Sequence, residues 1–371
     1  MLTHKILSIY YSTNKTIYKH PEPAVMNVQE KWIRAFETMF RKCKVEPGEV
    51  VRLLTETESR PINVQLAELA LARMGAVPVQ ITVPSLPINT PVPVRSTGAS
   101  HVIQNMPPVI NALSGPGLVV DLTVEGLLHS PELPGILGSG ARVLMVSNEH
   151  PETLERLTTD LDLTAPVKKG VKMLANAKVM TVTSEAGTNL TINLENAKVG
   201  GVWGGADRPG LVQHWPGGIC LAFPAANSVN GTLVMDTGDV NLTFKRYLEQ
   251  PVTLHIENDY VTRIEGKNLD AELMRSYMEA WQDRDAYAVS HVGWGMNPQA
   301  RWDALQMFDK ADTNGTELRA FAGNFLYSTG ANDVAGRHTL GHFDLPLRHC
   351  TVALDGVMVV DQGKLCDDVF Q

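Results

Sequence analysis

The stretch that decides the fold reads GEVVRLL at residues 48–54, PINVQLAELALARM at 61–74 and VPVQITV at 77–83. The two outer segments are short and rich in aliphatic and β-branched residues, as buried strands are. The middle segment carries apolar residues at helical spacing and stops at Gly75. A strand, a helix and a second strand at this spacing predict a parallel sheet covered by helices.

The same alternation extends on both sides of this stretch. Apolar residues at helical spacing predict a helix over residues 27–43, and residues 1–25 are interpreted as an irregular lead-in. Further strands are predicted at 118–122 and 142–146, with helices at 131–137 and 151–161. These elements together predict an α/β N-terminal domain with a mostly parallel sheet.

The pattern changes near residue 170, where β character takes over. Segments 179–183 and 190–194 flank a turn-like stretch and predict a hairpin. More strands are predicted at 231–236, 252–257 and 260–266, with one helix at about 270–281. A chain of 371 residues is long for one core. We therefore predict two domains, an α/β domain at residues 1–168 and a β-rich α+β catalytic domain at residues 169–371.

Composition narrows the class of protein. Hydrophobic residues make up 44% of the chain and charged residues 19%, and the net charge is -8. These values predict a globular protein and disfavour nucleic acid and anionic membranes as partners. The first ten residues are a poor secretory signal, and no stretch reaches the ~20 apolar residues of a spanning helix. We expect a cytoplasmic location. The four cysteines form no CxxC pair, which disfavours a disulfide framework or a zinc ribbon.

Two motifs in the second half carry the chemistry, SHVGWG at 290–295 and GHFDLPLR at 341–348. His342 and Asp344 are two apart in a predicted strand, so their side chains leave the same face. With His291, placed in a Gly-rich turn, they offer two imidazoles and one carboxylate. That set suits a non-haem Fe(II) with open positions. An isolated HxD triplet is also compatible with a surface pair or a buried hydrogen bond, and the adjoining apolar run 345–347 favours the metal.

Other histidines have weaker claims. His214 precedes WPGG at 215–218, a rigid turn in which an imidazole could serve catalysis or a structural hydrogen bond. His129 ends an apolar segment, and the residues alone favour a structural role. The chain lacks GxGxxG after a strand, the Walker and GxSxG motifs, and HExxH.

At these motifs the chain resembles the 2,5-dihydroxypyridine 5,6-dioxygenases of bacterial nicotinate and nicotine breakdown. The shared stretches occur in the same order over roughly residues 45–360, namely 127–132, 214–218, 290–295, 322–330 and 342–348. The resemblance implies a fold shared with metallopeptidases of the aminopeptidase T type.

The resemblance also assigns roles. It implies that His291, His342 and Asp344 bind Fe(II), that His129 lies at the entrance and that His214 is an active-site histidine. Members of the family have a second histidine near the position of His214, and this chain has none within several residues of His214. The proton-transfer role and the substrate therefore stay open at this point.

The implied reaction opens a hydroxylated pyridine ring between C5 and C6 with O2 and gives N-formylmaleamate. It needs no external reductant and no organic cofactor. As a hypothesis, Ser328 and Tyr327 hydrogen-bond the ring. Trp215 or Trp294 stacks on the ring. The resemblance further implies a homo-oligomer, with a hexamer as the expected form.

Two other classes compete with the dioxygenase. An aminopeptidase T-like metallopeptidase would hold two metals with two glutamates and an extra histidine. In this chain one of those glutamates aligns with Ile219 and the other with His291. The extra histidine aligns near Asn324. Isoleucine cannot bind metal, so the two-metal centre lacks its bridging carboxylates. A binding or scaffold protein is the third class, and the intact HxD and SHVGWG motifs weigh against it.

Overall fold

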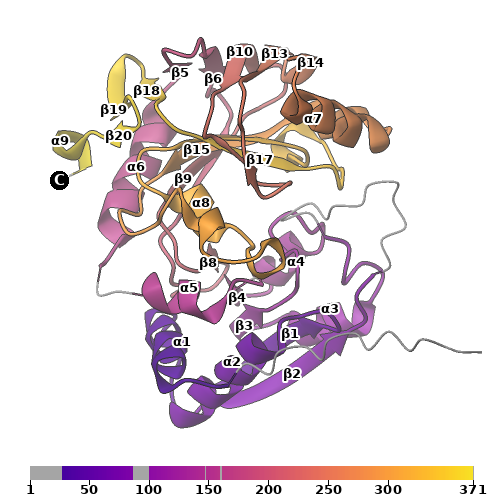
Figure 1. Cartoon of the computed structure of the whole chain (residues 1–371). Coiled ribbons are helices and arrows are strands. Elements are labelled where there is room, and N and C mark those ends of the chain that lie inside the picture. The colour runs from indigo at the N-terminus through magenta and orange to yellow at the C-terminus, as the bar shows by residue number, and fades with distance from the viewer. Residues whose placement is uncertain (1–26, 87–99, 147, 159–160, 371) are drawn as a thin grey trace, which may run out of the picture.

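The N-terminal part is built on a five-stranded parallel sheet in the order β2-β1-β3-β4-β8 (Figure 1). The computed structural model describes residues 27–86, 100–146, 148–158 and 161–370, so the predicted lead-in at 1–25 lies outside the described residues. The strands are β1 Val50–Glu56, β2 Val77–Val83, β3 Gly117–Asp121, β4 Ala141–Met145 and β8 Val212–His214. The predicted parallel sheet is confirmed.

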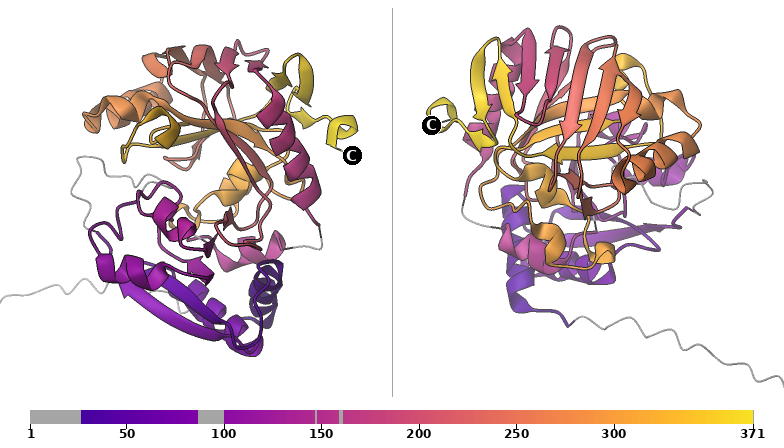
Figure 2. Two further views of the ribbon diagram at one scale, coloured as in Figure 1. Left: turned by 180° about the vertical axis from the view of Figure 1, so that it is seen from behind. Right: turned by 45° about the horizontal axis from the view of Figure 1, so that its top comes forward.

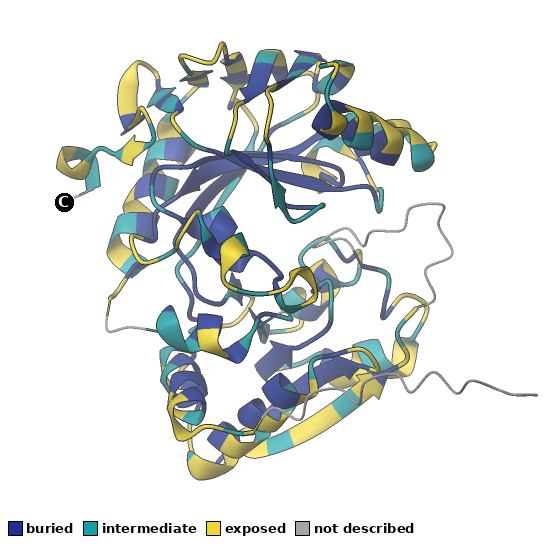
Figure 3. Ribbon diagram, in the orientation of Figure 1, coloured by how far each residue is buried: buried dark blue, intermediate teal, exposed yellow. Residues whose placement is uncertain are grey.

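Helices cover both faces of this sheet, so its central strands β1, β3 and β4 are largely buried. On β3, Leu118 and Val120 belong to the core shared with the first two helices, whereas Val119 belongs to the core on the opposite face. The exposed positions lie mainly on the outer helix surfaces and on the edge strand (Figure 3). The helices are α1 Glu30–Lys42, α2 Pro61–Arg73, α3 Pro107–Leu113, α4 Leu133–Gly138 and α5 Pro151–Arg156.

The C-terminal part is built on two large antiparallel sheets that share one apolar core (Figure 2). The eight-stranded sheet has the order β14-β13-β10-β6-β5-β18-β19-β20, and the five-stranded sheet has the order β17-β16-β15-β9-β7. The strands of the first are β5 Val179–Thr183, β6 Asn189–Asn193, β10 Val229–Met235, β13 Val252–Glu257, β14 Tyr260–Glu265, β18 Thr351–Leu354, β19 Val357–Asp361 and β20 Lys364–Leu365. Those of the second are β7 Lys198–Val202, β9 Ile219–Phe223, β15 Val289–Gly295, β16 Phe325–Thr329 and β17 Phe343–Leu347.

The predicted β-rich domain is thus confirmed, including the hairpin of β5 and β6. The remaining elements are α6 Thr164–Asn176, α7 Leu269–Ala280, α8 Thr316–Ala320, α9 Asp367–Phe370, β11 Val240–Asn241, β12 Arg246–Tyr247 and the 3-10 turns η1 Arg284–Tyr287, η2 Ala304–Gln306, η3 Lys310–Asp312 and η4 Asp333–Ala335. No helix within the described ranges combines the length and apolar character that crossing a membrane requires.

The two parts are connected by more than one covalent crossing. Helix α6 runs across residue 168, and β8 returns to the N-terminal sheet, where it pairs with β4. The pairing brings His214 next to Met145 at the carboxyl end of the parallel strands. The division at residue 168 stays a prediction, and the sheet itself reaches beyond it.

Strand β15 replaces the Gly-rich turn that the sequence predicted around His291. Its glycines permit close packing of strands rather than a reversal, because a Cβ on Gly293 would lie 1.9 Å from the carbonyl oxygen of Cys220 on β9. A Cβ on Gly295 would lie 2.2 Å from the carbonyl oxygen of Phe321. His291 is therefore held on a rigid strand at the centre of the sheet.

Replacing Gly293 by alanine should lower the free energy of unfolding by about 2 kcal/mol or more, because the new methyl group must displace backbone. The matched control is Gly200→Ala on β7 of the same sheet, where a Cβ meets no atom within 4 Å. Urea unfolding of both variants checks the prediction. Equal stability of the two would show that β9 and β15 are packed less tightly.

Candidate active site

The three predicted metal ligands lie on one face of the five-stranded sheet. His291 on β15 pairs in register with Ser328 on β16, and Ser328 pairs with Asp344 on β17. His342 precedes Asp344 by two residues and shares its face, as the sequence spacing predicted. The three side chains line one cavity between the two parts of the chain.

The ligating atoms approach a common point. The Nε2 atom of His342 lies 3.3 Å from Oδ1 of Asp344, and Nε2 of His291 lies 3.8 Å from the same oxygen. All three residues are at most 4% exposed. The structure thus brings His291 to two residues that lie more than fifty positions further along the sequence.

Asp344 is surrounded by groups that favour its charge. Nε of Arg319 donates to Oδ2 at 2.5 Å, and Ser328 donates its hydroxyl to Oδ1. Burial would raise the pKa of Asp344, but Arg319 and the two imidazoles hold the pKa of this carboxyl well below its usual range. The carboxylate is therefore ionised at neutral pH, and Arg319 leaves Oδ1 as the oxygen that faces the histidines.

The hydrogen bonds of Ser290 define which nitrogen of His291 carries the proton. The Ser290 hydroxyl donates to the carbonyl of Ala331 at 2.5 Å, because a carbonyl can only accept. The same oxygen then accepts from Nδ1 of His291, 3.1 Å away. Nε2 consequently keeps its lone pair on the side of Asp344. Burial lowers the pKa of His291 to about 4, so the ring is neutral, as a metal ligand must be.

These residues fit a metal ion in the chemistry of their donors. A lone pair on His291, the imidazole of His342 and an ionised carboxylate form the two-histidine, one-carboxylate set of non-haem iron sites. Within the described part of the chain, no group of three or more His, Cys, Asp or Glu side chains is already spaced at ligand distances.

Two further histidines line the cavity, His129 from a turn after β3 and His214 from β8. The ring of His129 lies 5.2 Å from that of His342 and 5.8 Å from that of His291, measured between centroids. His214, at the end of β8, donates from Nδ1 to the carbonyl of Trp215 at 2.9 Å. Its Nε2 is then the basic nitrogen. Burial and then Arg319 lower the pKa of His214 to about 4, and burial with the neighbouring imidazoles lowers the pKa of His129 well below its usual value.

The other predicted substrate-binding residues are placed differently. Trp294 and Tyr327 alternate with His291 and Ser328 along their strands, so both side chains enter the core between the sheets. Trp215 packs against Phe36, with ring centroids 4.7 Å apart, in the core of the N-terminal part. Ser328 is adjacent to the site but donates to Asp344. The structure does not bring the three aromatic residues to the cavity.

Several cavity residues were missed by the sequence analysis. The polar ones are Glu125, Asn314, Thr316 and Arg319, and the apolar ones are Leu128, Met145, Val202, Ile219, Leu221 and Leu326. Phe223 also stacks on His291, with centroids 5.4 Å apart. Leu128 and Leu326 lie within the shared stretches 127–132 and 322–330, whereas the others belong to no such stretch and come from separate loops and strands that meet only after folding.

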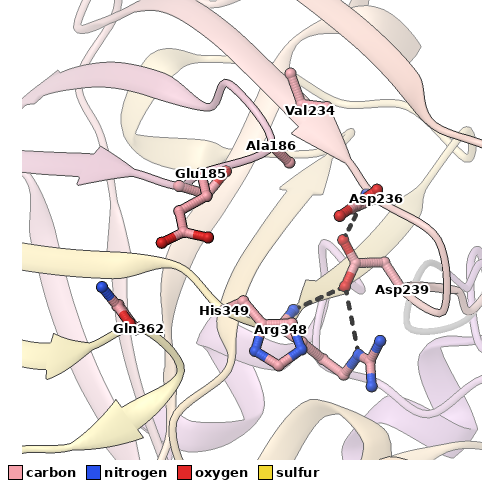
Figure 4. Close-up of a pocket in the computed structure, with 9 residues that line it drawn as sticks. Glu185, Ala186, Val234, Asp236, Asp239, Arg348, His349 and Gln362 are labelled. Atoms are coloured by element: carbon pink, nitrogen blue, oxygen red, sulfur yellow. Dashed lines mark hydrogen bonds and ion pairs between the residues drawn. The ribbon is translucent and has the colours of Figure 1, made fainter.

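A second cavity lies among turns of the C-terminal part (Figure 4). Its buried carboxylate, Asp239, accepts the backbone N–H groups of Asp236 and Arg348 at 2.8 Å each. Asp239 therefore fastens two turns to one another. None of the predicted ligands is among the residues that line this cavity.

Comparisons with known proteins agree with the fold. A solved structure of 2,5-dihydroxypyridine dioxygenase from Pseudomonas putida KT2440 superposes with a TM-score of 0.85 at 35% identity, covering 90% of this chain and 96% of that one. Wild-type AmpT from Thermus thermophilus superposes with a TM-score of 0.61 at 14% identity, covering 91% and 99% of the chains, which shows a common fold alone. The curated 2,5-dihydroxypyridine 5,6-dioxygenase of P. putida is 36% identical over 335 residues, 89% of this chain and 94% of that protein.

The relatives and the superposed structures therefore place this chain among dioxygenases built on the aminopeptidase T-like fold. The sequence model of 2,5-dihydroxypyridine 5,6-dioxygenase matches residues 31–367. The chain belongs to the 2,5-dihydroxypyridine 5,6-dioxygenase family, as its motifs predicted, and not to the peptidases that share its fold.

The buried neutral histidines make the stability of the metal-free protein depend on pH. His214 has a pKa of about 4 in the folded protein and an ordinary value of 6.5 when unfolded. Its contribution is complete above pH 6.5 and is lost as the pH falls towards 4, because only the unfolded state then takes up the proton. The loss amounts to about 3 kcal/mol.

Urea unfolding in the presence of a chelator at pH 7, 6 and 5 measures this dependence. His214→Gln should reduce the slope of the unfolding free energy against pH by the amount that corresponds to about one proton. His338→Gln, at a site whose side chain is 62% exposed, should leave the slope unchanged. Parallel curves for wild-type protein and His214→Gln would contradict the burial of a neutral imidazole.

Proposed function

We propose that the protein is an Fe(II)-dependent ring-cleaving dioxygenase that converts 2,5-dihydroxypyridine and O2 to N-formylmaleamate. The observation that carries this proposal is the approach of His291 and His342 to one oxygen of Asp344 in a chain of this family. The P. putida relatives named for this substrate support it. Both oxygen atoms of O2 enter the product, so the reaction balances without a reductant.

His291, His342 and Asp344 would hold the metal. Bound Fe(II) would supply open coordination positions that bring the ring hydroxyl and O2 together, which replaces a three-body encounter by an intramolecular step. Arg319 keeps Asp344 ionised and occupies Oδ2, so that one carboxylate oxygen is presented to the ion. The apolar wall of Ile219, Leu221 and Leu326 excludes water from the reacting groups.

His214 is the proposed acceptor of the ring hydroxyl proton. Its Nδ1–H is committed to the carbonyl of Trp215, which leaves Nε2 as the base on a neutral ring. His129 belongs to the N-terminal part and stands beside the ligand histidines, which supports its proposed place at the entrance.

The sequence-based expectations about assembly and location remain part of the proposal. A small aromatic substrate and O2 follow from the dioxygenase class. We further propose a homo-oligomer, a hexamer in size, located in the cytoplasm. Light scattering at micromolar concentration checks the assembly, and a monomer would contradict it.

Substituting alanine for His291, His342 or Asp344 should abolish stoichiometric Fe(II) binding and turnover while the protein stays folded. Anaerobic Fe(II) titration and oxygen uptake with 2,5-dihydroxypyridine check this. His255→Ala, which removes a surface partner of Glu265, serves as the control. A ligand variant with normal iron content and rate would remove that residue from the proposed set.

His214→Ala should lower kcat roughly 100-fold or more while Fe(II) content stays close to one per chain, because it removes a base and not a ligand. Single-turnover oxygen uptake separates this effect from slow product release. His338→Ala is the matched control at the surface. Unchanged kinetics would return His214 to a structural role.

A further inference from the structure

One wall of the active-site cavity is a short segment that the N-terminal part holds in place. Asn314, Thr316 and Arg319 all line the cavity, the last two from α8. The buried carboxylate of Glu149 accepts the backbone N–H of Thr316 at 2.5 Å and that of Asn314 at 3.2 Å. The position of this wall is therefore determined by hydrogen bonds across the two parts.

A second contact holds the same helix. Nη2 of Arg156 lies 2.7 and 2.9 Å from the two carboxylate oxygens of Glu317, whose side chain is 3% exposed. Glu317 points away from the cavity towards α5, and Thr316 and Arg319 face the opposite way, into the cavity. Helix α8 thus presents two polar side chains to whatever occupies the site.

The hydroxyl of Thr316 has no hydrogen-bond partner among the residues that the structure describes. Thr316 is 2% exposed, and its Oγ1 makes no hydrogen bond to any of the residues described by the structure. Burying a hydroxyl without a partner costs about 1–3 kcal/mol, so such a group is rare unless a ligand or solvent completes it. The amide of Asn314, by contrast, already donates to the carbonyl of Val124 at 3.5 Å.

We propose that the Thr316 hydroxyl recognises the substrate by hydrogen-bonding the C2 oxygen of the ring while the C5 hydroxyl lies at the metal ligands. Thr316 and Arg319 are three apart on α8, which places their Cβ atoms about 5–6 Å from each other on one face. Arg319 contacts Asp344 through its guanidinium, and Thr316 lines the same cavity as the ligand set. The C2 and C5 oxygens occupy opposite ends of the ring, so one can meet Thr316 while the other lies at the ligands.

This assignment rests on the proposed function and adds a determinant of specificity to it. The rest of the wall is largely apolar, so it binds the faces of any ring of this size. A buried donor that the substrate must satisfy rejects rings that lack the matching oxygen. Thr316 would accordingly distinguish 2,5-dihydroxypyridine from 3-hydroxypyridine, which has the metal-binding hydroxyl alone.

The test is anaerobic binding of both rings to Fe(II)-loaded protein, followed by absorbance. Thr316→Val should weaken binding of 2,5-dihydroxypyridine roughly 3- to 10-fold and leave 3-hydroxypyridine unchanged. Thr316→Ser keeps the hydroxyl and should restore discrimination. Thr313→Val, three residues earlier, is the matched control, because the Thr313 hydroxyl donates to the carbonyl of Asp309 outside the cavity. Thr316→Ala provides the same comparison with a smaller side chain.

The outcomes separate the two proposals. Wild-type affinity in Thr316→Val, or equal loss of both rings, would overturn the role of Thr316 while leaving the dioxygenase assignment intact. Wild-type protein that binds neither Fe(II) nor 2,5-dihydroxypyridine would overturn the proposed function, and the role of Thr316 with it. Fe(II) content of the variants, measured in the same samples, should match that of wild-type protein.

Discussion

The burial of the Asp344 carboxylate is the constraint on which the site depends. An ionised carboxyl at 2% exposure is costly unless charge and hydrogen bonds compensate it. Arg319 supplies the positive charge and Ser328 a hydroxyl, so α8 and β16 must lie where they do. The same arrangement leaves one oxygen facing two imidazoles. The contacts that compensate the buried charge of Asp344 are therefore the same contacts that orient this carboxylate as a proposed metal ligand.

The sequence predicted the parts of this structure that depend on local spacing. The parallel sheet followed from strand–helix alternation, and the shared face of His342 and Asp344 followed from their two-residue interval. The segment around His291 is a strand and not the predicted turn, so the alternation of side chains between the two faces applies there as well. Trp294 is three residues from His291 and therefore faces the core. Arg319 and Thr316 could not be predicted, because their roles arise from pairing between segments that are remote in sequence.

The likeness to AmpT at 14% identity is a likeness of fold alone, and a fold by itself does not determine chemistry. In this chain the cavity wall beside the histidines includes the aliphatic side chains of Ile219, Leu221 and Leu326, which cannot bind a metal. What the site can bind is therefore decided by a few side chains on these strands. The backbone of the sheet sets where the side chains that face the cavity begin, and the residue types at these positions decide what is bound.

Strand β8 has implications for how the chain is synthesised. It completes the first sheet but follows α6 and β7 in the sequence, so the nascent chain emerges with β4 as an open edge. Such an edge pairs readily with other strands until residue 214 has left the ribosome. A cut at residue 168 would remove β8 and leave β4 as the edge of the sheet. Recombination in evolution, like gene fusion in the laboratory, would have to carry the chain as one unit through His214.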